Sequence, residues 1–368
     1  MSGVFEITGV GTILLAWVLA LTCIVVVTRT WGRLARPGVG AVMSRVLAQV
    51  LVTVMIVLAV ATTVNRSGLW FVSWRDLASV VTGPTGGEMR EHGARAAAAA
   101  GADLGEWGPG DAQVVASPAP VPDTTTRLST YTVTGPASGY TGTVHVWAPA
   151  ADEAPADGRP VLQVFHGYPV SAQSAFANLG LDDVHRTLPG AILLIPDWSP
   201  GELDTECTDG PAGKMETWLT TDVPAWAVDT LGARADRGSW ATFGYSAGGW
   251  CAAMTAMRHP QTYSAAVSLG GYSRPLFSPR YRPFPAEGGA YDLPLLARTD
   301  PPSVALLAQY SDKDAVSAPS TRELIDATRE PLSVTHWATP DAGHRVGAWK
   351  PLVPQTLEWL GRTAPGFA

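Results

Sequence analysis

"SWATFGYSAGGWCAAMTAMRHP", residues 239–260, is the stretch that decides how this chain folds. It contains Gly244-Tyr245-Ser246-Ala247-Gly248, which is a G-x-S-x-G pattern. The serine of such a pattern either sits exposed on a sharp strand-to-helix turn or is an ordinary serine in a glycine-rich loop. Glycine accounts for 38 of the 368 residues, so the pattern can arise by chance, and the flanking sequence has to decide between the two.

The flanks of Ser246 predict a strand before it and a helix after it. Residues 239–244 form a short apolar run, and the small residues that follow continue to Pro260, which ends the predicted helix. Similar apolar runs alternate with helical segments along the chain, at 159–167, 191–198, 263–271, 302–310 and 332–340. This alternation is typical of an α/β fold with a mostly parallel sheet covered on both faces. In an α/β-hydrolase fold, the turn at Ser246 is the nucleophile elbow, which makes Ser246 the predicted nucleophile.

A serine nucleophile needs a base and an acid that orients the base, and in this fold they follow in the order Ser, acid, His. His344 lies in "TPDAGHRVGAWK", after the last strand and before the last helix, and is the predicted base. His336 lies inside a strand run and is disfavoured. The acid should follow the strand that ends in "VALLAQ". Asp314 is preferred there, with Asp312 in the same loop and Glu323 in the next helix as alternatives.

An oxyanion hole requires two backbone N–H donors. The residue after the nucleophile, Ala247, should supply one, and Tyr168 in the "HGYP" loop should supply the other. His166 in the same loop is a candidate substrate contact or a structural residue of the turn, and Trp250 is a second candidate substrate contact. We expect no cofactor and no metal, since the sequence has no phosphate-cradling or dinucleotide loop, no H-E-x-x-H and no C-x-x-C.

Two uncharged apolar runs precede this domain, at about residues 8–28 and 46–65. Each is close to the roughly 20 residues that a helix needs to cross a bilayer. A signal peptide is disfavoured for the first run, because the N-terminal tail carries Glu6 and no basic residue. The segment between the runs contains four arginines, at positions 29, 33, 36 and 45, which favours a cytoplasmic location for it. The C-terminal domain is therefore predicted to be extracytoplasmic on a multi-pass anchor in the cell membrane.

Composition divides the chain into three parts. Residues 1–81 are the predicted membrane anchor, residues 82–126 a linker rich in Gly, Pro and Ala with a possible short helix, and residues 127–368 the catalytic domain. Residues 77–368 hold 19 of the 25 basic and 30 of the 32 acidic residues, which argues against nucleic acid as a partner. Cys207 and Cys251 could pair in an oxidising compartment or stay as free thiols.

Several further segments resemble a known family. Residues 214–220, "KMETWLT", are similar to the K-W-E-T-F-L-T segment of secreted mycolyltransferases, and "HPQTYSAAVSLGG" and "GHRVGAWK" are similar to other segments of that group. From about residue 128 to 360 the chain resembles the esterase D family of α/β-hydrolases, which includes the mycolyltransferases. The resemblance implies Ser246 as nucleophile, His344 as base and the Tyr168 and Ala247 amides as oxyanion hole.

Three departures restrict what the resemblance implies. His166 stands where mycolyltransferases have a sugar-contacting aspartate; their acid is a glutamate on a helix, which keeps Glu323 under consideration; and they lack two leading membrane spans. We therefore expect a membrane-anchored serine esterase acting on an ester or acyl-lipid. The alternatives are an acyltransferase that uses a sugar or lipid hydroxyl, and an inactive membrane-tethered binding module. The sequence leaves the oligomeric state open.

Overall fold

The computed structural model describes residues 5–34, 38–83, 87–92, 121–123, 128–148, 158–181 and 184–367. The chain forms two compact units. One contains residues 1–85 together with the loop Pro340–Arg345, and the other contains residues 86–339 and 346–368. We call them the anchor unit and the hydrolase unit. The loop that carries His344 thus groups with the anchor, although it lies far from it in sequence.

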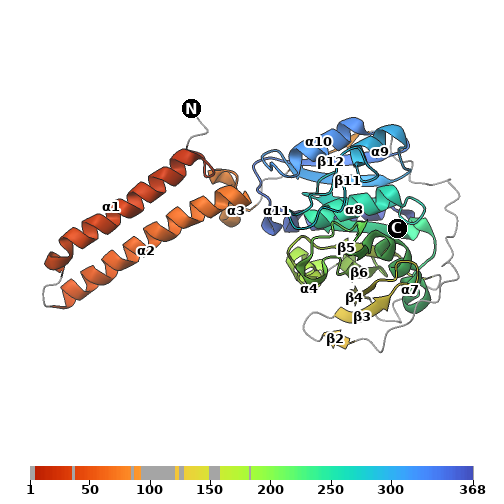
Figure 1. The fold of residues 1–368 in the computed structure, drawn as a ribbon, viewed down its shortest axis with the longest axis horizontal. Coiled ribbons are helices and arrows are strands. Elements are labelled where there is room, and N and C mark those ends of the chain that lie inside the picture. The colour runs from red at the N-terminus through yellow and green to blue at the C-terminus, as the bar shows by residue number, and fades with distance from the viewer. Residues whose placement is uncertain are drawn as a thin grey trace. The chain divides into compact units, whose positions relative to one another are not determined.

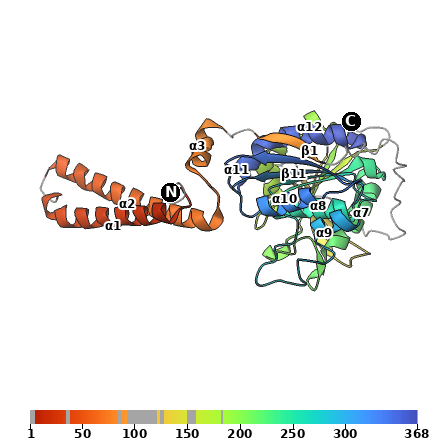
Figure 2. The ribbon, with the colours of Figure 1, turned by 90° about the horizontal axis from the view of Figure 1, so that it is seen from above.

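The anchor unit is built on two long helices that pack side by side as a hairpin (Figures 1 and 2). Helix α1 spans Val10–Leu34 and α2 spans Val39–Gly68, so both predicted spans are helical. Helix α1 begins two residues later than predicted and ends six residues later, whereas α2 extends beyond both predicted bounds. By length and composition, both helices could cross a membrane. The short helix α3, Trp74–Thr82, follows, and the Ser73 side chain caps it by accepting a hydrogen bond from the Asp76 amide.

The hydrolase unit is organised around a ten-stranded sheet with the order β1-β12-β11-β10-β9-β5-β6-β4-β3-β2. The strands from β6 through β5, β9, β10 and β11 to β12 are parallel, and the flanking strands are antiparallel. Their bounds are β1 Glu88–His92, β2 Val121–Asp123, β3 Leu128–Thr134, β4 Thr141–Trp147, β5 Val161–Phe165, β6 Ile192–Pro196, β9 Trp240–Tyr245, β10 Ala265–Leu269, β11 Ala305–Ser311 and β12 Ser333–Thr339. Strands β7, Asp209–Gly210, and β8, Gly213–Lys214, form a separate hairpin.

Helices cover both faces of this sheet, as the continuous apolar runs of its central strands require. One apolar core lies under α6 Met215–Thr217, α7 Val223–Leu231, α8 Ala247–Arg258, α9 Leu293–Thr299 and α10 Ala318–Ala327. The other lies under α4 Ala172–Leu179, α5 Val184–Thr187, α11 Val346–Trp349 and α12 Val353–Thr363. Figure 2 shows α12 on one side of the strands and α8, α9 and α10 on the other. The arrangement is that of an α/β-hydrolase, as predicted.

Part of the expected linker belongs to the sheet. Residues 88–92 form strand β1, antiparallel to β12, and residues 121–123 form strand β2, antiparallel to β3. The possible helix that starts at Glu88 is therefore wrong for its first five residues, and its remainder lies outside the described residues. Both strands are at sheet edges, where pairing on one side is enough to hold a short polar segment in extended form.

Candidate active site

Ser246 is the single residue between β9 and α8, and its backbone conformation is one that few non-glycine residues adopt. Its φ is 56° and its ψ is −126°. The Ser246 amide donates to the Leu269 carbonyl at 2.9 Å, and the Ser246 carbonyl accepts from the amides of Gly249 and Trp250 at 2.9 and 3.1 Å. Such strain persists only where the surroundings enforce it, and it concentrates at functional sites. The strand, turn and helix predicted around Ser246 are all confirmed.

The two glycines of the pattern are required by close backbone packing. A Cβ at Gly244 would lie 2.0 Å from the Gly248 carbonyl oxygen, and a Cβ at Gly248 would lie 2.1 Å from the Phe165 carbonyl oxygen. Neither neighbour is a flexible side chain that could move away. The G-x-S-x-G pattern therefore forms a tight turn that packs against the end of β5. The alternative, an ordinary serine in a loose glycine-rich loop, is ruled out.

The loop after β5 passes directly beside Ser246. A Cβ at Gly167 would lie 2.8 Å from Cε2 of Tyr245 and 3.4 Å from Cβ of Ser246. Tyr168, the next residue, is half-buried, and Ala247 is the first residue of α8, where amides lack partners within the helix. The two backbone segments predicted to form an oxyanion hole therefore flank Ser246.

His166 and Trp250, the two predicted substrate contacts, are both fully buried. His166 stacks on Trp198 with ring centroids 5.0 Å apart, and its Nε2 lies 3.7 Å from Oδ1 of Asp197. Trp250 stacks on Tyr272, and its Nε1 donates to the Glu206 carbonyl at 3.0 Å. Both rings are thus buried against another aromatic side chain, and a substrate contact for either residue stays a prediction.

Cys207 and Cys251 form a disulfide, which settles the pairing that the sequence left open. Cys251 lies on α8, five residues after Ser246, so the bond ties α8 to the loop before β7. A stable disulfide is typical of extracytoplasmic proteins.

A buried pair of carboxyl groups lies beside this disulfide, and sequence reasoning missed it. Burial raises the pKa of Asp204 to about 6. Burial, together with the neighbouring Asp204, raises the pKa of Glu206 well above its usual range. The Tyr272 hydroxyl donates to Oε1 of Glu206 at 2.6 Å. Acidic residues among glycines and threonines are typical of a solvated loop, so the sequence did not indicate that Asp204 and Glu206 are buried.

The three candidate acids lie in very different surroundings. Asp314 is 3% exposed, and its carboxylate accepts from the Val316 amide at 2.9 Å and from the Ser317 hydroxyl at 2.7 Å. The exposed carboxylate of Asp312 pairs with Arg322 at 2.5 Å. Glu323 accepts two hydrogen bonds from Arg274 at 2.6 and 2.7 Å, and this arginine lowers the pKa of Glu323. Of the three, Asp314 alone is buried and accepts hydrogen bonds from its own loop, and these surroundings favour it as the acid.

The residues with predicted catalytic roles follow the carboxyl ends of parallel strands. Ser246 follows β9, Asp314 follows β11, and the loop Pro340–Arg345 follows β12, while His336 lies on β12 itself. Gln309 of β11 links the ends of its two neighbouring strands, β10 and β12, since its Oε1 accepts from the Gly270 amide at 3.0 Å and its Nε2 donates to the Thr339 hydroxyl at 2.9 Å. Sites of open α/β sheets form at this edge.

His344 is half-buried in the loop between β12 and α11. Its amide donates to the carbonyl of Leu69, the residue that follows α2 as its C-cap, at 3.2 Å. Beyond the loop, Trp349 of α11 packs with its ring centroid 5.5 Å from that of Tyr245, the residue before Ser246. A Cβ at Gly270 would lie 2.6 Å from the Trp349 ring, so this end of the loop is tightly packed.

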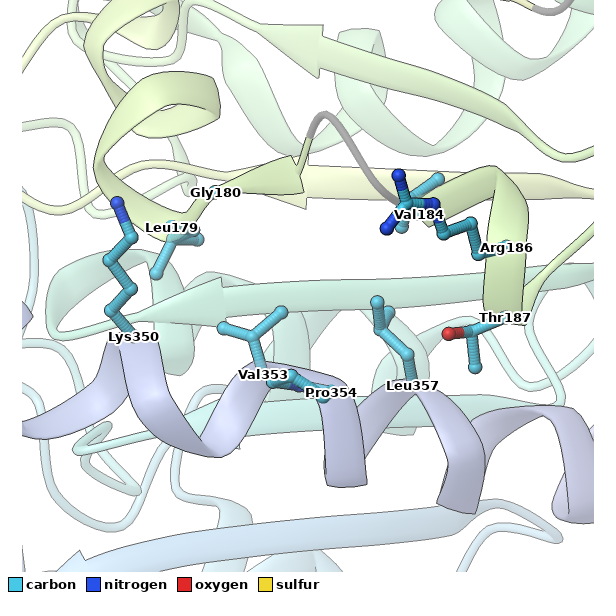
Figure 3. A pocket seen from close by; sticks show the side chains of 9 residues that line it. All are labelled: Leu179, Gly180, Val184, Arg186, Thr187, Lys350, Val353, Pro354 and Leu357. Carbon is cyan, nitrogen blue, oxygen red and sulfur yellow. The ribbon is translucent and has the colours of Figure 1, made fainter. Parts of the chain in front are cut away.

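A small pocket elsewhere on the hydrolase unit is a separate feature. It has a volume of about 250 Å³ and lies between α4, α5 and α12, with Lys350 and Arg186 beside an apolar floor of Leu179, Val353 and Leu357 (Figure 3). None of the predicted catalytic residues lines it. We therefore do not place the reaction there.

An ionic network stabilises the C-terminal end of α8. The buried carboxylate of Glu216 accepts from Arg258 Nε at 2.7 Å, from His259 Nε2 at 2.8 Å and from the Tyr291 hydroxyl. Burial alone would raise the pKa of Glu216, but these three donors prevail and lower it to about 2. Glu216 is thus the residue of "KMETWLT" that joins α6 to the end of α8.

Replacing Glu216 with glutamine should lower the free energy of unfolding by about 2–3 kcal/mol at neutral pH, because Arg258 and His259 lose a charged acceptor. The exposed pair of Glu358 and Arg362, 3.9 Å apart, offers a matched control, and Glu358→Gln should have almost no effect. The folded pKa of about 2 lies below the ordinary value of 4.5, so the carboxylate stabilises the fold above about pH 4.5 and this stability is lost as the pH falls toward 2. In urea unfolding of the full chain, the difference between wild type and Glu216→Gln should therefore shrink over that window. A difference that stays constant with pH would contradict the assignment.

Comparison with known proteins extends the description of the fold. No family model matches the chain. An uncharacterised protein of Corynebacterium glutamicum is 22% identical over 227 residues, which cover 55% of this chain and 53% of that protein. This chain therefore spans about half the length of its curated relative.

Solved structures of esterases share the fold. The S-formylglutathione hydrolase of Agrobacterium tumefaciens has a TM-score of 0.54 at 15% identity, covering 68% of this chain and 99% of that one. A ferulic acid esterase has a TM-score of 0.53 at 17% identity, covering 64% and 98%. The fluorophosphonate-binding serine hydrolase F of Staphylococcus aureus has a TM-score of 0.51 at 14% identity, covering 63% and 96%. These likenesses show the α/β-hydrolase fold.

Proposed function

We propose that this protein is a membrane-anchored serine hydrolase that cleaves esters through an acyl-enzyme. The observation that carries the proposal is the strained backbone of Ser246, at φ 56° between β9 and α8. A serine held in this way directs its hydroxyl out of the sheet edge and begins a helix whose amides can receive an anion. The shared fold with esterases and serine hydrolases supports the same reaction class.

The reaction follows from the roles of the named residues. Ser246 Oγ attacks the ester carbonyl carbon while His344 takes the hydroxyl proton, and the buried carboxylate of Asp314 orients the imidazole and stabilises its charged form. The Tyr168 and Ala247 amides stabilise the negative oxygen of the tetrahedral intermediate. His344 then donates its proton to the departing alcohol, which leaves Ser246 acylated. A water molecule, activated by His344, attacks the acyl-enzyme and releases the carboxylic acid.

The anchor places this chemistry at a membrane. Helices α1 and α2 are long and apolar enough to span a bilayer, and the arginine-rich segment between them favours a cytoplasmic side for that end. The hydrolase unit is then extracytoplasmic, in keeping with the disulfide between Cys207 and Cys251. A reporter fused to the C-terminus should be active only outside the cytoplasm.

A fluorophosphonate probe tests the proposal directly on the full chain in detergent. The probe should label the native protein at one site and should fail to label Ser246→Ala. No labelling of the native protein, with its fold verified by thermal unfolding, would contradict the enzyme and favour a binding module. Labelling that persists in Ser246→Ala would contradict the nucleophile.

Acyl transfer is tested on the same preparation. The similarity of residues 214–220 to a mycolyltransferase segment motivates this second candidate. Short-chain and long-chain esters should be offered with and without sugar acceptors. Hydrolysis predicts free acid as the product in every case, whereas an acylated sugar that forms faster than free acid would identify a transferase.

A further inference from the structure

The loop that carries His344 docks onto the segment that follows the second long helix. We call residues Leu69–Thr82 the juxtamembrane segment, and all contacts described below lie within the anchor unit. The Gly343 backbone lies against it, since a Cβ there would be 1.9 Å from the Trp70 carbonyl oxygen and 2.8 Å from that of Leu69. His344 itself donates its amide to Leu69, 3.2 Å away.

An ion pair fixes this docking. Arg345 Nη1 lies 2.7 Å from Oδ1 of Asp76 and 3.0 Å from the Trp70 carbonyl oxygen. The guanidinium also lies 4.5 Å from the centre of the Phe71 ring. Asp76 is 2% exposed, and its Oδ2 accepts from the Val72 amide at 3.0 Å. A buried carboxylate with several donors gives a specific geometry, because an alternative position would leave it unpaired.

The juxtamembrane segment is in turn held by α2. The Asn65 side chain both accepts from the Phe71 amide and donates to the Phe71 carbonyl, each at 2.8 Å. Asn65 is 6% exposed near the end of α2. Continuous polar contacts therefore run from α2 through Phe71 and Asp76 to Arg345, the neighbour of His344.

We propose that Asp76 and Arg345 are positioning residues for catalysis, so that the membrane anchor fixes the orientation of the base His344. The proposal rests on the function proposed above. A base displaced by about 1 Å from its nucleophile can lose on the order of 100-fold in rate while substrate binding is unaffected. Loss of the docking should accordingly lower kcat and leave KM nearly unchanged.

Three variants of the full chain in detergent test this proposal. Arg345→Gln and Asp76→Asn remove the ion pair, and Gly343→Ala pushes the loop off the Trp70 carbonyl without changing any charge. Each should reduce kcat by about 10-fold to 100-fold with KM within twofold. The fluorophosphonate labelling rate should fall in parallel. The rate is expressed per labelled site, so that unfolded protein does not contribute.

Matched controls separate positioning from folding. Arg362→Gln breaks an exposed pair, and Gly289→Ala adds a Cβ whose nearest neighbour is 3.8 Å away, so both should keep wild-type kinetics. Variants that unfold at lower temperature but keep wild-type kcat per labelled site would overturn the positioning role and leave the hydrolase intact. Wild-type protein that never labels would overturn both proposals.

Discussion

Replacing Ser246 with alanine should reduce ester hydrolysis by at least about 10⁴-fold, because the acyl-enzyme can no longer form. The variant should keep its fold, since alanine requires no more space than serine and tolerates the same backbone about as well. The measurement is kcat/KM for a short-chain ester on the full chain in detergent, with thermal unfolding recorded in parallel.

Ser174→Ala is the matched control for this substitution. Ser174 is exposed on α4, and its hydroxyl lies within hydrogen-bond distance of the Ser171 hydroxyl, at 2.8 Å. Removing the Ser174 hydroxyl should therefore leave activity within twofold of wild type. A Ser246→Ala protein that keeps more than about a tenth of the wild-type rate would identify a different nucleophile.

Asp314→Asn should lower kcat by about 10³-fold to 10⁴-fold, whereas Asp312→Asn and Glu323→Gln should each stay within about threefold. An amide in place of the carboxylate cannot stabilise the charged imidazole and favours the wrong tautomer. The two control carboxylates pair with Arg322 and Arg274 instead. Steady-state kinetics of the three variants, normalised to the amount of labelled serine, makes the comparison.

The outcome of that comparison is decisive for the acid. A large loss in Glu323→Gln with normal Asp314→Asn would assign the acid to α10, as in the mycolyltransferases that the chain resembles. A large loss in Asp312→Asn would move it two residues toward β11.

The elements around Ser246 were predictable because each carries a local signal. The apolar run before Ser246, the small residues after it and the two flanking glycines all report on a turn that backbone packing enforces. The uncharged runs of α1 and α2 are equally local, as is the polar loop after β12 that contains His344. Patterns within one segment therefore revealed the sheet, the anchor and the candidate nucleophile.

Features formed by residues distant in sequence were not predictable from such patterns. The sequence around Asp76 contains no pattern that predicts its ion pair with Arg345, which lies 269 positions later. The edge strands β1 and β2 have linker-like composition, and their extended form comes from partners elsewhere in the chain. The burial of Trp250 likewise depends on Tyr272 and Glu206, which it meets only in the folded unit.

The left-handed backbone at Ser246 also has a consequence for the stability of the fold. An L-residue held in such a conformation costs on the order of 1–3 kcal/mol, a cost that glycine largely avoids. That is a sizeable fraction of the free energy of unfolding of a typical folded domain, which is about 5–15 kcal/mol. Selection for stability alone would therefore favour glycine at position 246. Under the proposed function, the Ser246 hydroxyl is a reactive group that the chain keeps although it lowers stability.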